Sequence, residues 1–257
     1  MKIQSTKYNN PAFRAIPLAK YNYFDKKDQN VTVYQLEKSD VGYLRGISDN
    51  IEKFYKKHDI NDFSTKQVVE EAVNAGIKIL EAKHNPEEKA KVMLALCENE
   101  PSAILIGNVL KTDNKGLYHY SSRKNHAKDE TELDWLATWN KNILGEGKVI
   151  VNEYFHTLAK DGFKQVYVRS EIPENSFAKN FYEKMGFEPL SEDQREIIRK
   201  NDNKYLIGSF DEPDDYIIPM KATSSDIEKT IYKRDKELKR KEITDTGSVD
   251  LPLLVLD

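Results

Sequence analysis

Two segments in the second half of the chain carry residue types and spacings that could act on a phosphate-bearing molecule. The first, residues 142–148, reads Asn-Ile-Leu-Gly-Glu-Gly-Lys and precedes an amphipathic run. Gly145 and Gly147 lack a Cβ, so an anion could approach backbone N–H groups closely at the positive end of a helix dipole. Lys148 adds a positive charge, and Glu146 adds an unfavourable negative one unless its side chain turns outward. We interpret the segment as a phosphate cradle; an ordinary strand–helix loop is the alternative.

Two other phosphate-binding patterns fail at this loop. A P-loop requires glycine at position 142 and serine or threonine at position 149, which are Asn142 and Val149 here. A dinucleotide-binding fingerprint requires a third glycine where Ile150 stands. The cradle therefore belongs to neither class.

The second segment, residues 175–187, has the pattern of a short capped helix. Asn175 is a suitable N-cap, and Ala178 is small enough for close approach of another group. Phe181 can pack inward, whereas a buried Tyr182 needs a hydrogen-bond partner for its phenol. We expect the Tyr182 hydroxyl to face the same cleft as the cradle, the alternative being two aromatic residues in an ordinary core.

Together the two segments resemble the GNAT superfamily of acyl-CoA-dependent N-acyltransferases. The family's loop pattern, Gln/Arg-x-x-Gly-x-Gly/Ala, is met except at its first position, where this chain has Asn142. The family's helix pattern, Asn-x-x-Ala-x-x-Phe/Tyr-Tyr-x-x-x-Gly-Phe, is matched throughout. The matching residues are Asn175, Ala178, Phe181, Tyr182, Gly186 and Phe187. The resemblance covers residues 31–221.

The resemblance implies direct transfer of an acetyl group from acetyl-CoA to a primary amine, without a metal. Tyr182 would protonate the departing thiolate as general acid. The strand before the loop would pair its backbone with the pantetheine arm of the coenzyme. The residues that this implies for coenzyme binding are Leu136, Ala137, Thr138, Asn142, Leu144, Gly145, Glu146, Gly147, Lys148, Asn175 and Phe181.

The attacking amine needs a base, because only about one lysine-like amine in a thousand is neutral at pH 7. Glu132 and Asp134 occupy alternate positions of the predicted strand and are expected to project to one face. Glu132 is our choice, and Glu130, Asp134 or a water chain stay open. Carboxylates facing solvent at the start of a strand are the alternative interpretation.

Strand-like and helix-like patterns alternate along the chain. Strands are predicted at 31–36, 91–97, 103–110, 117–121, 132–138, 165–170, 205–210 and 215–220, and helices at 49–57, from Ser64, from Gly145 to Gly162, at 175–186 and at 225–240. This order predicts an α/β (α+β) fold around a mixed sheet. The resemblance implies that the central sheet is GNAT-like, mostly antiparallel and flanked by helices. We expect one domain at 31–221, a polar N-terminal extension at 1–30 containing Pro11 and Pro17, and a C-terminal helix and tail at 222–257.

Composition narrows the classes of partner. The net charge of −3 gives no reason to expect nucleic acid, and no apolar run is long enough for a membrane span. The five histidines lack metal-ligand spacing, and the lone Cys97 suits a buried thiol in a cytoplasmic protein. We expect a monomer or homodimer acting on an amine of a small molecule or a protein. A non-catalytic, GNAT-like acyl-CoA-binding or protein-interaction module is the alternative, favoured by Asn142, by the extension at 1–30 and by the lysine-rich C-terminal helix at 225–240.

Overall fold

A mixed sheet forms the centre of the protein. The computed structural model describes residues 14–24, 28–81, 90–109, 130–139, 145–171, 177–193, 217–244, 247–252 and 254. In these ranges ten strands form one sheet. Nine of them pair in the order β10-β1-β2-β3-β4-β5-β6-β8-β7, and β9 pairs with β1. Of the pairs described, only β5–β6 is parallel. The predicted class, a mostly antiparallel sheet flanked by helices, is confirmed.

The bounds of the elements are as follows. The strands are β1 Arg14–Phe24, β2 Asp28–Gln35, β3 Lys91–Cys97, β4 Glu100–Val109, β5 Glu130–Thr138, β6 Gln165–Glu171, β7 Glu188–Pro189, β8 Ile217–Thr223, β9 Arg240–Glu242 and β10 Val249–Asp250. The α-helices are α1 Val41–Asp49, α2 Ile51–Lys57, α3 Phe63–Glu81, α4 Glu146–Lys160, α5 Phe177–Lys184 and α7 Ser224–Leu238, and a 3₁₀ turn spans Lys38–Asp40. The strands predicted at 117–121 and 205–210 lie outside the described residues.

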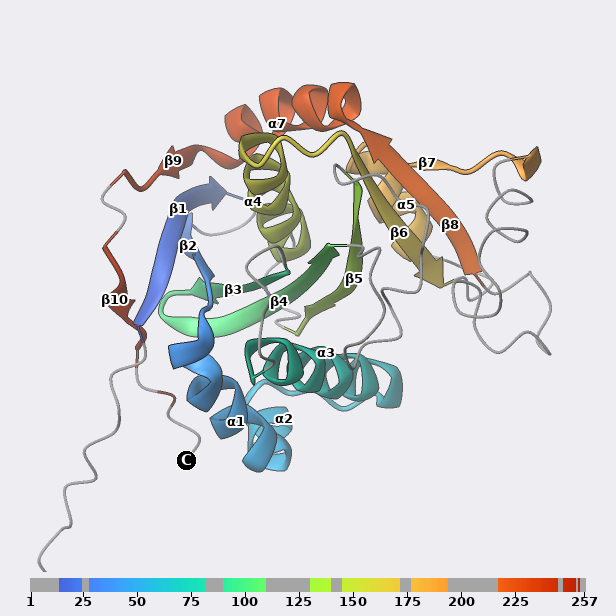
Figure 1. Ribbon diagram of the computed structural model, residues 1–257. Helices are drawn as coiled ribbons and strands as arrows, with labels where there is room; N and C mark the ends of the chain where they lie inside the picture. Colours follow the sequence, from blue (N-terminus) through green and yellow to red (C-terminus); the bar gives the residue numbers. More distant parts are fainter. Residues whose placement is uncertain are drawn as a thin grey trace, which may run out of the picture.

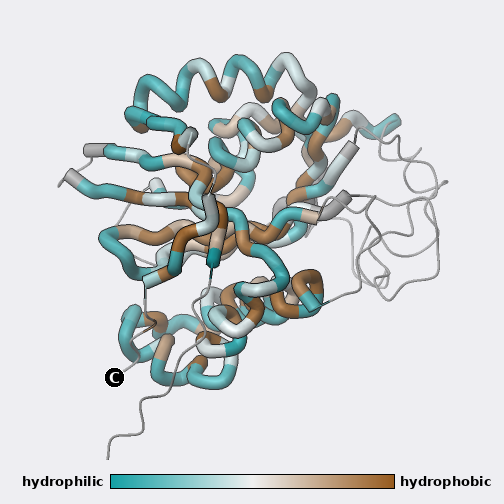
Figure 2. The backbone as a smooth tube through the Cα atoms, turned by 60° about the vertical axis from the view of Figure 1, so that its left-hand side comes forward, coloured by the Kyte–Doolittle hydropathy of each residue, from teal (hydrophilic) through white to brown (hydrophobic). Residues whose placement is uncertain are grey.

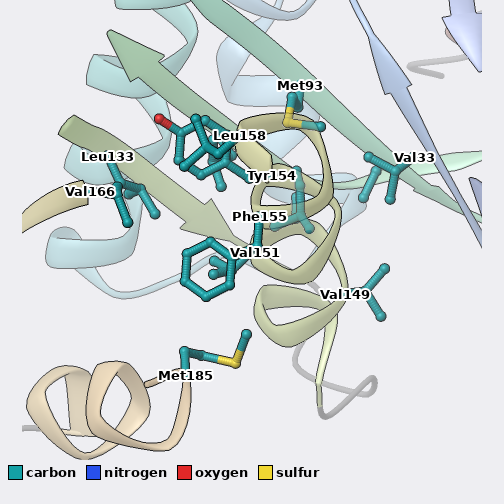
Figure 3. Close-up of a cluster of buried hydrophobic side chains, with 14 of the residues drawn as sticks. Val33, Met93, Leu133, Val149, Val151, Tyr154, Phe155, Leu158, Val166 and Met185 are labelled. Atoms are coloured by element: carbon teal, nitrogen blue, oxygen red, sulfur yellow. The ribbon is translucent and has the colours of Figure 1, made fainter. Parts of the chain in front are cut away.

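Helices cover both faces of the sheet and create two cores. α1, α2 and α3 pack on one face, whereas α4, α5 and α7 lie on the other (Figure 1). Apolar residues gather in the strands and in the helix faces turned toward them, as Figure 2 shows. Figure 3 shows the core under α4, where side chains of that helix meet others from the strands and from the end of α5. The labelled residues are Val33, Met93, Leu133, Val149, Val151, Tyr154, Phe155, Leu158, Val166 and Met185.

Several local predictions differ from the structure. Helix α1 was not predicted, and two further differences concern the β3–β4 connection and the cap of α3. The β3–β4 connection is a tight turn in which Glu98 and Asn99 have φ values of 48° and 70°, so β4 begins at Glu100 rather than at residue 103. Asparagine tolerates this left-handed conformation better than most residues. The cap of α3 is Asp62, whose Oδ1 accepts from the Thr65 N–H at 2.7 Å, and not Ser64.

The expectation of a polar extension at 1–30 is wrong for residues 14–24. They form β1, which pairs with β2 and buries Ala15, Ala19 and Tyr21. Burial alternates along residues 14–21 of β1, and the pairing register shifts between Pro17 and Ala19, so the proline falls at a bulge where a missing N–H is tolerated. The C-terminal segment is also integrated, since β9 and β10 pair with β1 and α7 packs on α4.

A buried polar cluster ties both ends of the chain to α4. The carboxylate of Glu153 on α4 accepts from the Tyr21 hydroxyl at 2.6 Å. It also accepts two bonds from the Arg240 guanidinium, from Nε at 2.8 Å and from Nη2 at 3.0 Å. The side chains of Arg240 and Glu153 are only 9% and 4% exposed. A bidentate, charge-assisted pair of this kind holds β1, β9 and α4 in one arrangement.

Replacing Arg240 should test this cluster. Arg240→Met leaves the Glu153 carboxylate buried with only neutral partners, and removing one member of a buried ion pair typically costs about 3 kcal/mol. We expect that loss in the free energy of unfolding measured with urea. Lys241→Met removes the same charge from an exposed neighbour on β9 and should change stability by less than about 0.5 kcal/mol. Equal effects of the two variants would contradict the structural role of the cluster.

Candidate functional site

The sheet forks between β5 and β6. β5 pairs with β4 as far as the register pair Ala103–Thr138. Its parallel pairing with β6 ends at Leu133–Val168, although β6 continues to Glu171 in register with β8. Figure 1 shows the two strands separating beyond this point. Within the described ranges, residues 135–138 of β5 therefore have no partner strand on the β6 side, and an extended chain could pair there.

A β-bulge causes the fork. On β4, Ile106 pairs with Trp135 and the next residue, Gly107, pairs with Leu133, so Asp134 is the extra residue of β5. A bulge bends its strand and increases the local twist, which turns β5 away from β6. The bulge also breaks the simple alternation that the sequence predicted for Glu132 and Asp134.

Gly107 allows helix α4 to support the strand at the fork. A Cβ on Gly107 would lie 2.3 Å from the Tyr154 hydroxyl oxygen, so only glycine fits. That hydroxyl donates to the Glu132 carbonyl at 3.3 Å and lies 3.3 Å from Thr131 Oγ1. The fully buried Tyr154 thus anchors β5 immediately before the bulge.

The first turn of α4 lies beside the end of β5 and beside α5. Gly145, which precedes α4, has φ 119°, a conformation that favours glycine. A Cβ on Gly147 would lie 3.3 Å from the Phe181 ring and 3.5 Å from Thr138 Cγ2. Gly147, Thr138 and Phe181, from three separate segments, therefore meet at one point. The structure brings together these three residues that the sequence predicted to share a site.

Tyr182 lies on the α5 side of the fork. α5 packs against β6, the strand that diverges from β5. The Tyr182 ring contacts the rings of Phe181 and Phe187 edge-on, with centroid separations of 5.2 and 5.5 Å. The residue is 8% exposed. Aromatic contacts on two sides restrict the ring to one orientation.

Glu132 lies on the other face of the sheet. Its neighbours Thr131 and Leu133 face α4, where Thr131 approaches Tyr154 and Leu133 joins the core. Successive side chains of a strand alternate between faces, so Glu132 projects toward the face on which α3 packs. It is 2% exposed, which excludes the solvent-facing alternative. Tyr182 and Glu132 are thus placed on opposite sides of the fork.

Glu146 is buried in the first turn of α4. The residue is 1% exposed, and neither of its carboxyl oxygens has a hydrogen-bond partner among the described residues. Burial raises the pKa of Glu146 to about 8, and the nearby Ser102 hydroxyl opposes this increase. Its side chain therefore turns inward and not outward, the orientation in which a charged Glu146 would have been compatible with a bound anion. At neutral pH the group is protonated and adds no negative charge to the cradle.

The remaining predicted binding residues have varied environments. Leu136 is half-buried against the core under α4, Ala137 is buried on the α3 face, and Thr138 is exposed. Lys148 is partly exposed and pairs with Glu237 of α7 at 3.6 Å. The predicted binding residues Asn142, Leu144 and Asn175 lie outside the described residues, as does the side chain of Glu130. The sequence analysis did not predict that Tyr154 anchors β5. The only signal in the sequence is Gly107, whose missing side chain makes room for the tyrosine, and that signal is weak.

Other groups have structural explanations. His156 pairs with Asp235 at 2.9 Å. Cys97 is buried, which raises its thiol pKa to about 12 and makes it a poor nucleophile at neutral pH. Across the ranges given above, no group of three or more His, Cys, Asp or Glu side chains could hold a metal ion. No helix of the described part combines the length and apolar character needed to cross a membrane.

Comparisons with known proteins give matches at the level of structure. No protein-family model matches the chain, and no curated protein matches it significantly. Among solved structures, the chain is similar to the PaiA N-acetyltransferase of Thermoplasma acidophilum in complex with coenzyme A, with 13% identity over 75% of this chain and 98% of that one and a TM-score of 0.40.

Two further solved structures illustrate the same likeness. The aminoglycoside acetyltransferase AAC(6')-Ib in complex with coenzyme A has 18% identity, covers 78% of this chain and 98% of its own, and has a TM-score of 0.46. A GNAT-family acetyltransferase of Staphylococcus aureus has 14% identity, coverages of 76% and 99%, and a TM-score of 0.42. At these identities the likeness concerns the fold, and it identifies no substrate.

The titration of Glu146 predicts a pH-dependent stability. Its pKa is about 8 in the folded protein against 4.5 for the ordinary group. Between these values the folded state holds a proton that the unfolded state has released, so stability decreases as the pH rises toward 8. Glu146→Gln removes the effect. The free energy of unfolding of Glu146→Gln minus that of the wild type, measured with urea, should increase by up to about 1.4 kcal/mol per pH unit between pH 5.5 and 7.5.

Glu228→Gln, an exposed substitution on α7, is the control for this experiment and should show no pH-dependent difference from the wild type. A Glu146→Gln difference that stays constant with pH would show that the carboxyl is not protonated in the folded state.

Proposed function

We propose that this protein is an N-acetyltransferase that moves an acetyl group from acetyl-CoA to a primary amine. One observation carries the proposal: the fork between β5 and β6 opens beside both the glycine-bearing first turn of α4 and the tyrosine-bearing helix α5. An unpaired strand edge can hold an extended, amide-containing arm, and a helix N-terminus can hold a diphosphate. Coenzyme A has these two parts in series.

The chain's own groups fit such a coenzyme. Backbone groups of residues 135–138 would bond the amides of the pantetheine arm as an added strand does. The N–H groups of the first turn of α4 would receive the diphosphate, and Gly147, which has no Cβ, lets this turn pack closely against Phe181 and Thr138. Protonation of Glu146 keeps a second negative charge away from that anion. Acetyl-CoA supplies the activated acetyl group as a thioester.

The transfer is a single displacement. The amine nitrogen attacks the thioester carbonyl carbon, a C–N bond forms, and the C–S bond breaks. A backbone N–H of β5 at the fork would stabilise the oxyanion of the tetrahedral intermediate. The Tyr182 hydroxyl donates its proton to the departing thiolate. The products are an N-acetyl amide and the free thiol of coenzyme A.

The opposite placement of Tyr182 and Glu132 suits this reaction. A nucleophile and a leaving group occupy different sides of a tetrahedral intermediate. Tyr182 stands on the α5 side, from which the thiolate departs, while Glu132 projects to the α3 face. We therefore infer that the amine enters from the α3 face and that Glu132 accepts its proton, directly or through one water.

A binding and turnover assay tests the proposed function directly. Acetyl-CoA binding is measured by calorimetry, and thiol release is followed with a panel of amines: a polyamine, an aminoglycoside, an amino acid and a peptide. We expect micromolar binding and amine-dependent thiol release. Binding without thiol release from any amine would support the non-catalytic module instead, and absence of binding would end both proposals.

Tyr182→Phe should separate chemistry from binding. Loss of a general acid typically lowers turnover by about 10²–10⁴-fold. The change removes one oxygen and retains the ring contacts with Phe181 and Phe187, so the dissociation constant of acetyl-CoA should change less than about threefold. Tyr232→Phe, at an exposed position of α7, is the matched control and should retain full turnover. Normal turnover of Tyr182→Phe would remove the phenol from the mechanism.

Gly147→Ala should distort the cradle. The new methyl group would lie 3.3 Å from the Phe181 ring and 3.5 Å from Thr138 Cγ2, so the first turn of α4, whose N–H groups are proposed to hold the diphosphate, would be pushed away from α5. We expect acetyl-CoA affinity to fall at least tenfold, about 1.4 kcal/mol, as measured by calorimetry. Gly46→Ala on α1, where a Cβ would meet only Leu254 at 3.3 Å, should leave affinity unchanged. Unchanged affinity of Gly147→Ala would place the anion elsewhere.

A further inference from the structure

Helix α7 caps the C-terminal end of α5. The last carbonyls of a helix lack intrahelical partners and must be satisfied from outside. Two of those at α5 bond to side chains of α7: Arg234 Nη2 donates to the Lys184 carbonyl at 2.6 Å, and Thr230 Oγ1 donates to the Met185 carbonyl at 3.3 Å. The positive charge of Arg234 also complements the negative end of the α5 dipole.

The contact between the two helices is close. Gly186, which follows α5, has φ 85°, and a Cβ there would lie 2.5 Å from Thr230 Oγ1. The Arg234 side chain is only 5% exposed, so its hydrogen bonds are shielded from water. Even at this depth its charge is compensated, because it pairs with Glu237 three residues further along α7.

Glu237 also contacts the first turn of α4, which forms the proposed cradle. Glu237 pairs with Lys148, in the first turn of α4, at 3.6 Å. A polar chain therefore runs from α4 through Glu237 and Arg234 to the end of α5. Its three links differ in strength. The Lys148–Glu237 pair is partly exposed, and such pairs contribute little, whereas the other two links are made by Arg234, whose side chain is buried. Arg234 is the member expected to matter.

Helix α5 needs this support. It has eight residues, and isolated helices of that length are marginal in water. One side of it contacts the core under α4 through Tyr182 and Met185. The sheet beside α5 is not continuous, because the pairing of β5 with β6 ends at Leu133–Val168.

We propose that α7 is a brace that fixes α5, and with it Tyr182, relative to the first turn of α4, and that Arg234 is its positioning residue. The catalytic part of this inference rests on the proposed function. The brace fixes the distance between the group that protonates sulfur and the turn that holds the diphosphate of the same coenzyme. Helix α7, which lies outside the fork, thereby sets the placement of Tyr182 at the fork.

Hydrogen–deuterium exchange tests the brace without any assay of activity. In Arg234→Met the exchange of amides in residues 177–187 should rise at least tenfold, while residues 149–158 of α4 keep their protection. Lys233→Met removes the same charge from an exposed neighbour on α7 and should leave α5 protected. Arg234→Lys keeps the charge but not the guanidinium fork and should restore protection in part. If Arg234→Met does not fold, Thr230→Val, which keeps the shape and removes one hydroxyl, replaces it, with a smaller rise expected.

Turnover tests the catalytic consequence. Arg234→Met should lower kcat about tenfold or more, because small misplacement of a reacting group reduces rate strongly. The dissociation constant of acetyl-CoA should stay within about threefold, and Arg234→Lys should recover part of kcat. Unchanged exchange in residues 177–187 would overturn the brace whatever the protein catalyses. Raised exchange with unchanged kcat would overturn the positioning of Tyr182, and absence of thiol release in the wild type would count against the proposed function alone.

Discussion

The site depends on one interruption of backbone hydrogen bonding. Because Asp134 is an extra residue between two consecutive pairs of β4 and β5, the strand bends and its pairing with β6 ends at Leu133. A strand edge inside a sheet is normally covered by its neighbour, and an uncovered one readily binds another chain. Here it is kept open by a rigid base, in which the buried Tyr154 hydroxyl contacts Glu132 and Thr131 beside Gly107.

Burial, rather than exposure, gives the candidate groups their properties. Glu146 is neutral at physiological pH because the first turn of α4 packs against the end of the β3–β4 hairpin, where Ser102 and Cys97 lie. Tyr182 is oriented by two neighbouring rings, and α7 supports the helix that carries it. Each of these side chains would behave differently in an isolated peptide. Their chemistry is a property of the packed layers around the fork.

Local patterns predicted much of this arrangement, and non-local contacts account for the rest. The continuous apolar run of β3 and the apolar stripe of α4 are short-range signals, so both elements were predicted close to their observed bounds. The place of β1 was missed because Pro17 and the polar residues of the segment suggested an extension, whereas its partners come from β2 and from residues 240–250. The inward turn of Glu146 could not be predicted either, since its neighbours are about fifty residues away in sequence.

The cluster around Glu153 has a consequence for the order in which the protein assembles during synthesis. Tyr21 emerges from the ribosome well before Glu153, but the guanidinium that neutralises this carboxylate belongs to Arg240, which is made much later. Until then α4 can dock on the sheet only with an uncompensated buried charge. Docking of α4 on the sheet is therefore disfavoured during synthesis until Arg240 is available. Until then the nascent chain would expose the apolar surface that α4 covers in the folded protein.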